Sequence, residues 1–154
     1  MAIRLATLAD RPVIERLLEL YLYDMAEIYR FPIGANGLYA YDRLDAFWQY
    51  AYLLEAGDDL TGLALVIDHC PITGRAPCWF MAEFFVMRSY RRTGLGLAAT
   101  RELIAAHPGA WHIGVINQNT SALSFWTRAL TDYAPTVSPV QHDGEAWTLH
   151  AFNA

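Results

Sequence analysis

The stretch Glu83 to Leu97 constrains the fold most, because it joins an apolar segment to a run of helix formers through glycines. Phe84–Val86 are aromatic or β-branched and follow further apolar residues, which predicts a buried strand. The segment from Leu95 to Ala106 is rich in helix formers, so we expect a helix there. The six residues at 91–96, Arg-Arg-Thr-Gly-Leu-Gly, therefore form the turn of a strand–turn–helix unit.

This turn has the properties of a phosphate-binding loop. Gly94 and Gly96 allow the backbone to turn tightly and to approach a ligand closely. The first turn of the following helix presents N–H groups without intrahelical acceptors, at the positive end of the helix dipole. Such a cradle suits a phosphate group. The alternative is a glycine-containing turn that binds nothing, and we favour binding because a downstream motif agrees with it.

Two motifs in order give the sequence a specific resemblance. The first is Arg-x-x-Gly-x-Gly at 91–96, preceded by Glu-x-x-Val at 83–86 and by Tyr90. The second follows a predicted strand at Trp111–Ile116 and reads Asn119, Ala122 and Phe125-Trp126. Together they resemble the acetyl-CoA loop and the Asn-x-x-Ala-x-x-Phe-Tyr motif of the GCN5-related N-acetyltransferase (GNAT) superfamily.

The resemblance implies an acetyl-CoA site. No His or Cys spacing resembles a zinc site, so we expect no metal. It assigns the pyrophosphate to the loop residues Arg91, Arg92, Thr93, Gly94, Leu95 and Gly96. The backbone groups of Phe84 and Val86 would bind the pantetheine arm. The resemblance also implies that Asn119 and Phe125 contact the cofactor, although an Asn at 119 also suits the cap of the next helix.

The predicted elements fit one domain spanning 1–154. A strand at Ile3–Ala6 precedes a helix that begins near Asp10 and continues into the twenties. A short helix is expected at Tyr41–Gln49 and strands at 50–55, 60–68 and 78–87. The strand–helix–strand unit ending at Ile116 should be parallel and right-handed. The chain then forms a helix at about 120–130 and a hairpin, 132–140 with 145–152, that turns at His142-Asp143-Gly144.

The fold class is therefore α/β (α+β). We expect a GNAT-like mixed, mostly antiparallel central sheet of about seven strands, with helices on both of its faces.

Composition excludes several classes of protein. Apolar residues make up 55% of the chain and charged residues 18%, which argues against extended disorder. A net charge of −5 argues against a nucleic-acid partner. No apolar run reaches membrane-spanning length, and the N-terminus lacks a signal-peptide pattern. Two cysteines form no disulfide framework, so we expect a reduced, cytoplasmic protein. The sequence does not fix the oligomeric state, and a homodimer is compatible with it.

Glu83 is the candidate base. Acyl transfer to an amine requires the ammonium group to lose a proton, and a carboxylate near the acceptor is the simplest acceptor of that proton. The resemblance places a catalytic Glu at this strand position, and burial would raise its pKa toward a useful range. The alternative is a structural carboxylate that bonds to backbone groups or an arginine.

A general acid is harder to identify. The family commonly places a Tyr after the Phe of the second motif, as an acid for the leaving thiolate, and this chain has Trp126 there. An indole N–H has no useful acidity, so we expect Trp126 to pack in the core. Tyr133 is a weak alternative candidate for the acid.

The segment from Tyr21 to Trp48 is rich in tyrosines and carboxylates, which would suit an amine or cation, although packed tyrosines and solvated acids are the simpler interpretation. The sequence thus predicts an acetyl-CoA-dependent N-acetyltransferase that acts on the amine of a small molecule. A CoA-binding regulatory or sensor module with little turnover is the alternative, which Trp126 keeps open.

Overall fold

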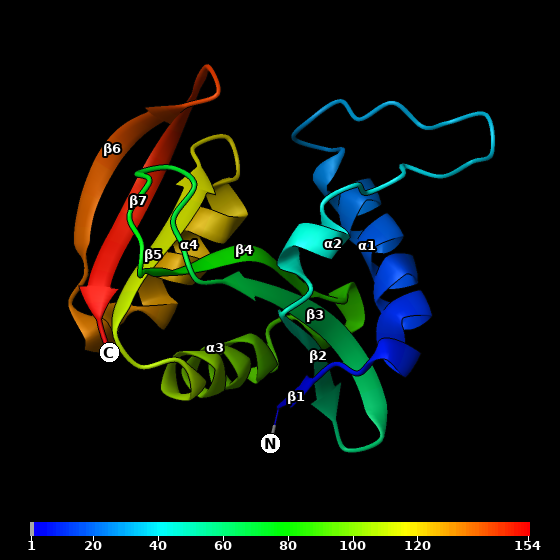
Figure 1. Ribbon diagram of the computed structural model, residues 1–154, viewed down its shortest axis with the longest axis horizontal. Helices are drawn as coiled ribbons and strands as arrows, with labels where there is room; N and C mark the ends of the chain where they lie inside the picture. Colours follow the sequence, from blue (N-terminus) through cyan, green and yellow to red (C-terminus); the bar gives the residue numbers. More distant parts are fainter. Residues whose placement is uncertain (1) are drawn as a thin grey trace.

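The computed structural model describes residues 2–154 and contains a seven-stranded sheet in the order β1-β2-β3-β4-β5-β7-β6 (Figure 1). The strands are β1 (Ile3–Leu5), β2 (Tyr50–Ala56), β3 (Asp59–Ile67), β4 (Trp79–Val86), β5 (Ala110–Ile116), β6 (Thr136–His142) and β7 (Glu145–Asn153). The helices are α1 (Arg11–Met25), α2 (Leu44–Phe47), α3 (Leu95–Ala106) and α4 (Thr120–Ala129). All pairs are antiparallel except β4 with β5, so the mixed, mostly antiparallel sheet is confirmed.

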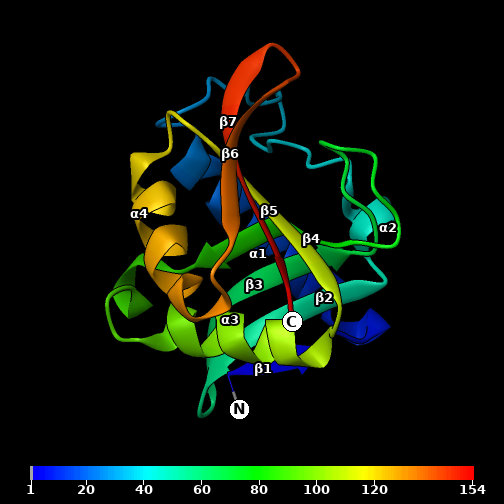
Figure 2. The same cartoon turned by 90° about the vertical axis from the view of Figure 1, so that its left-hand side faces the viewer.

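Helices cover both faces of the sheet, as expected. Ile14, Leu17 and Leu18 of α1 pack with Leu44 of α2 against one face of β2–β4. On the other face, buried residues of α3 and α4 pack against the sheet in a second, larger core cluster. Figure 2 shows α3 and α4 in front of the sheet and α1 behind it. Side chains in the carboxyl half of β4 therefore point alternately toward one helix pair and the other.

The parallel pair β4–β5 holds together over only two residue pairs. Trp79 lies opposite Trp111 and Phe80 lies opposite His112, and beyond this point the two strands diverge (Figure 1). Strand β5 continues instead beside β7 along its whole length. The carboxyl half of β4 therefore has a strand partner on the β3 side and an opening on the β5 side.

Strand β4 also contains a β-bulge. The β3–β4 register shifts between Leu65, which lies opposite Glu83, and Val66, which lies opposite Met81. Ala82 is thus the extra residue on β4. A bulge increases local twist and re-aims the neighbouring side chains. Glu83 follows this bulge directly and points toward the α1 face, where it bonds to Tyr41.

Two predicted boundaries were wrong. The helix expected at Tyr41–Gln49 is only α2, because Ala40 has a φ of 56° and residues 41–43 lead into the helix without joining it. The hairpin strand expected from residue 132 begins at Thr136, since Thr131–Tyr133 forms a 3-10 turn and Ala134 has a φ of 45°. The hairpin turn itself is confirmed.

Candidate active site

Two residues of β4 direct their backbone groups into the opening beside the strand. The Met87 N–H donates to the Thr61 carbonyl at 2.8 Å, so odd-numbered residues at this end of β4 bond to β3. Because successive residues of a strand alternate in the direction of their amide groups, Phe84 and Val86 present theirs on the opposite side. This side faces the gap left by β5, and it is where the sequence places a backbone-bonded ligand.

The loop after β4 presents the start of α3 to the same opening. Gly94 is the N-cap residue of α3 and has a φ of 89°, a left-handed conformation that favours glycine. Arg92 also has a positive φ, of 63°. Residues 91–94 are exposed, and the Thr93 hydroxyl donates to the Tyr90 carbonyl at 2.7 Å, which fixes the turn. The loop can therefore offer the first N–H groups of α3 to an anion.

Gly96 and Phe125 lie in contact, which joins the two sequence motifs in space. A Cβ placed on Gly96 would be 3.1 Å from the Phe125 ring and 3.8 Å from the Val86 side chain. The Phe125 ring in turn stacks on Phe84, with centroids 5.6 Å apart. The strand, the glycine loop and α4 thus meet at one place.

Trp126 belongs to the core, as predicted. It is only 6% exposed and packs edge-on against both Phe84 and Phe125, with centroids 5.2 and 4.9 Å away.

The Asn119 side chain accepts a hydrogen bond from the Ala122 N–H at 3.0 Å, which confirms its role as the N-cap of α4. Its amide nitrogen points toward the Met25 sulfur, 3.8 Å away at the end of α1.

The exposed Arg91 side chain folds back onto α1 and the end of β4. One terminal nitrogen lies 2.6 Å from the Asp24 carboxylate, and the Nε donates to the Val86 carbonyl at 2.8 Å. Arg88 bonds to the same carboxylate at 2.8 Å. Burial of Asp24 acts to raise its pKa, but the two arginines outweigh it and lower the pKa overall. Asp24 therefore stays ionised and ties the loop after β4 to α1.

Glu83 lies half-buried on the α1 face of β4. Its Oε1 accepts a hydrogen bond from the Tyr41 hydroxyl at 2.9 Å. Burial raises the pKa of Glu83, while hydrogen bonds from Tyr21 and Tyr41 and the positive charge of Arg43 oppose that rise. The net pKa is above the ordinary value, as expected for a carboxyl group that can act as a base near neutral pH.

The structure does not bring Tyr133 and Glu83 together. Tyr133 packs against Phe152, with centroids 5.2 Å apart, in the core cluster formed with α3 and α4. Glu83 contacts tyrosines on the α1 face. The suggested acid role of Tyr133 therefore gains no support from the geometry.

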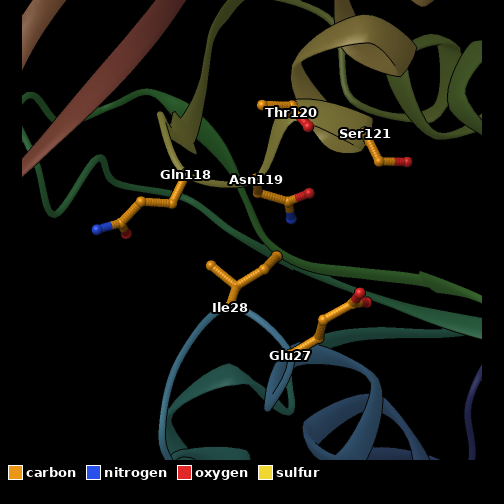
Figure 3. A pocket seen from close by; sticks show the side chains of 6 residues that line it. All are labelled: Glu27, Ile28, Gln118, Asn119, Thr120 and Ser121. Carbon is orange, nitrogen blue, oxygen red and sulfur yellow. The ribbon is translucent and has the colours of Figure 1, made fainter.

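A pocket of about 400 Å³ lies between the end of α1 and the start of α4. It is lined by Glu27, Ile28, Gln118, Asn119, Thr120 and Ser121. Figure 3 shows Glu27 and Ile28 rising from the α1 side toward Asn119. Glu27 supplies a carboxylate to the pocket.

Sequence reasoning missed the roles of Tyr21, Asp24 and Tyr41. It noted the abundance of tyrosines and acids but did not assign partners to them. The spacing of Tyr21, Asp24 and Met25 by three and four residues places them on one face of α1, which was an available signal. Their partners lie more than forty residues later in the chain, and no sequence pattern gives that pairing.

The described residues contain neither a metal-binding cluster nor a membrane-spanning helix. Within residues 2–154, no group of three or more His, Cys, Asp or Glu side chains is arranged to hold a metal ion. The described helices also include none with the length and apolar character needed to cross a bilayer.

Comparison with known proteins identifies the family. Residues 15–130 match the sequence model of the acetyltransferase (GNAT) family, so the chain belongs to that family. A comparison with curated protein sequences finds no match.

Solved structures share the fold. A GNAT-family acetyltransferase from Streptococcus agalactiae superposes with a TM-score of 0.74 at 17% identity, over 99% of this chain and 94% of that one. YncA from Salmonella typhimurium, solved with its cofactor acetyl-CoA, superposes with a TM-score of 0.64 at 20% identity, over 98% of this chain and 92% of that one. A Corynebacterium glutamicum structure described as histone acetyltransferase HPA2 and related acetyltransferase superposes with a TM-score of 0.69 at 22% identity, over 100% of this chain and 98% of that one.

Proposed function

We propose that residues 1–154 form one catalytic domain, an N-acetyltransferase that transfers an acetyl group from acetyl-CoA to the amine of a small molecule. The observation that carries this proposal is the opening beside β4. Phe84 and Val86 direct backbone groups into it, and the glycine loop at the start of α3 lies at its end. Family membership supports the choice of acetyl-CoA as the ligand for this opening.

The loop and strand supply binding groups of different kinds. The N–H groups of the loop at 91–96 and the first turn of α3 would hold the pyrophosphate, with the helix dipole favouring its charge. The Phe84 and Val86 backbone would bond to the amides of pantetheine. Since the Val86 carbonyl already accepts a bond from Arg91, the Val86 N–H is the group that would bond to pantetheine. Phe125 would contact the cofactor through its ring, which lies over Gly96.

Glu83 would act as the general base. When bound, acetyl-CoA supplies an activated acetyl group as a thioester. The Glu83 carboxylate would take a proton from the acceptor ammonium, directly or through a water molecule, which leaves the amine free to attack the thioester carbonyl. Transfer of the acetyl group would break the C–S bond and release the CoA thiolate, which would take up a proton from water. Its raised pKa makes the carboxylate a stronger proton acceptor than an exposed one.

The pocket at Glu27 supports an amine as the acceptor. Its carboxylate would attract a cationic substrate, and the neighbouring Gln118 and Thr120 offer further polar contacts. Amines carry a positive charge at neutral pH before they lose the proton to a base. A small molecule fits a pocket of about 400 Å³ better than a folded protein surface does.

A CoA-binding sensor stays the second candidate, because the buried Trp126 replaces the tyrosine that would protonate the leaving thiolate. A screen of amines with acetyl-CoA, read by release of free thiol and by the mass of the acetylated product, separates the two. We expect thiol release that depends on the amine. Binding of acetyl-CoA without release for any amine would overturn the proposed enzyme in favour of the sensor.

A further inference from the structure

The Glu83 carboxylate is held from the segment that connects α1 to α2. Tyr41 lies in that segment, two residues before the N-cap of α2, and its hydroxyl donates to Glu83 Oε1 at 2.9 Å. The Tyr41 ring packs against the core cluster under α1. Packing therefore fixes the ring and directs the hydroxyl at one of the two carboxylate oxygens.

A second tyrosine acts on the same carboxylate from α1. The Tyr21 ring packs against Phe85 with centroids 5.7 Å apart, and a hydrogen bond from Tyr21 favours the charged form of Glu83. Arg43 adds a positive charge on the same side. The hydrogen bond from Tyr41, the influence of Tyr21 and the charge of Arg43 thus favour the ionised form of Glu83 from α1 and the segment before α2.

The tyrosines can act only as donors in this arrangement. Burial and then the Glu83 charge raise the pKa of both hydroxyls, to which Asp24 adds at Tyr21 and Asp42 adds at Tyr41. Both hydroxyls therefore keep their protons at every pH at which the protein would work. Neither can serve as a base, and neither gives up its proton to a leaving thiolate.

We propose that Tyr41 is a positioning residue for acetyl transfer, which holds Oε1 of Glu83 so that Oε2 faces the acceptor amine. Tyr21 supports the same orientation from α1. The inference rests on the proposed role of Glu83 as the base. Because a hydrogen bond to the ionised form stabilises that form, Tyr41 also limits how far burial weakens the acidity of Glu83.

This arrangement links the acceptor side of the molecule to the base. Tyr41 belongs to the connection that follows Glu27 and Ile28 of the pocket, and Tyr21 lies on the helix that precedes them. The orientation of Glu83 therefore depends on the segment that recognises the substrate.

Tyr41→Phe tests the inference, because it keeps the ring and removes the hydroxyl. We expect kcat to fall about tenfold, as one lost hydrogen bond to a charged group can cause. The KM for acetyl-CoA should not change. The acidic limb of the kcat profile should move to higher pH, since Glu83 would lose its proton less readily. Tyr39→Phe, in the same segment, should change none of these quantities.

Two further measurements keep this test decisive. A carbon-13 NMR titration of the Glu83 carboxyl should give a higher midpoint in Tyr41→Phe than in the wild type, whether or not the protein turns over. Tyr21→Phe should move the midpoint in the same direction. An unchanged midpoint and an unchanged kcat in Tyr41→Phe would overturn the role of Tyr41 alone. Full activity in Glu83→Gln would instead overturn the proposed base.

Discussion

The Arg91 guanidinium bridges Asp24 and the Val86 carbonyl, at 2.6 Å from the carboxylate and 2.8 Å from the carbonyl oxygen. This contact joins α1, the end of β4 and the first residue of the glycine loop. The same two turns of α1 carry Tyr21, which acts on Glu83, and Met25, which meets Asn119 of α4. The end of α1 thus contacts Glu83, the loop after β4 and the start of α4.

Asp24→Asn should weaken the binding of acetyl-CoA. The variant releases Arg91 from its charged partner, so the loop loses the anchor that holds it against α1. Loss of one charge-assisted hydrogen bond predicts about a tenfold rise in Kd, measured by calorimetry. Glu15→Gln, on an exposed part of the same helix, serves as the control and should leave Kd unchanged. Tighter binding by Asp24→Asn would mean that Asp24 withholds Arg91 from the phosphates.

Gly94→Val should abolish the stabilisation of the protein by acetyl-CoA. A β-branched residue at a φ of 89° is strained, and the strain would deform the start of α3. Binding to the folded state raises Tm in proportion to occupancy, so the ligand-induced shift reports the intact loop.

Gly57→Val is the matched control for this experiment. Gly57 has a φ of 62° in the turn between β2 and β3, far along the chain from the loop. The substitution imposes a similar backbone strain and should lower the Tm of the free protein, but the shift with acetyl-CoA should survive. An equal loss of the shift in both variants would contradict a specific role for Gly94.

Stability should fall as the pH is lowered from about 6.5, the ordinary histidine value. Burial lowers the pKa of three imidazoles: His107, His112 and His150. Above pH 6.5 these three imidazoles are neutral in both the folded and the unfolded chain. Below it the unfolded chain takes up protons first, so the folded state loses its advantage until the lower folded pKa values are reached. The raised pKa of Glu83 acts in the opposite direction but involves a single group.

Chemical denaturation at several pH values measures this effect. His107→Gln should show a shallower fall in the free energy of unfolding between pH 6.5 and 5 than the wild type. His69→Gln removes an exposed imidazole and serves as the control variant. A free energy that is constant across this range in the wild type would contradict the assignment.

The sequence predicted the local parts of this site well. Residues 83–97 carry their structure in their own pattern: an apolar run, two glycines and a run of helix formers. Asn119 likewise reveals its capping role by its position before a helix. These predictions succeeded because each depends on contacts between residues close together in the chain.

The contacts around Glu83 could not be predicted in this way. The bulge at Ala82 depends on how β3 and β4 pair, and the bond to Tyr41 joins residues 42 positions apart. The prediction of a helix from residue 41 failed because it considered only residues that are close together in the chain. The first residue of the expected helix packs its ring in the core and donates to Glu83, which a local helix pattern does not anticipate.

Glu83→Gln tests the account most directly, because the amide keeps the shape of the side chain and cannot accept the proton of an ammonium group. We predict that kcat falls by about 10²–10⁴-fold, the usual effect of general-base assistance, and that the acidic limb of the pH profile disappears. The Kd for acetyl-CoA should stay within about twofold of the wild type. Glu55→Gln, a carboxylate on β2 paired with Arg4, should leave kcat unchanged. A Glu83→Gln protein that retains wild-type kcat and the acidic limb would contradict the account.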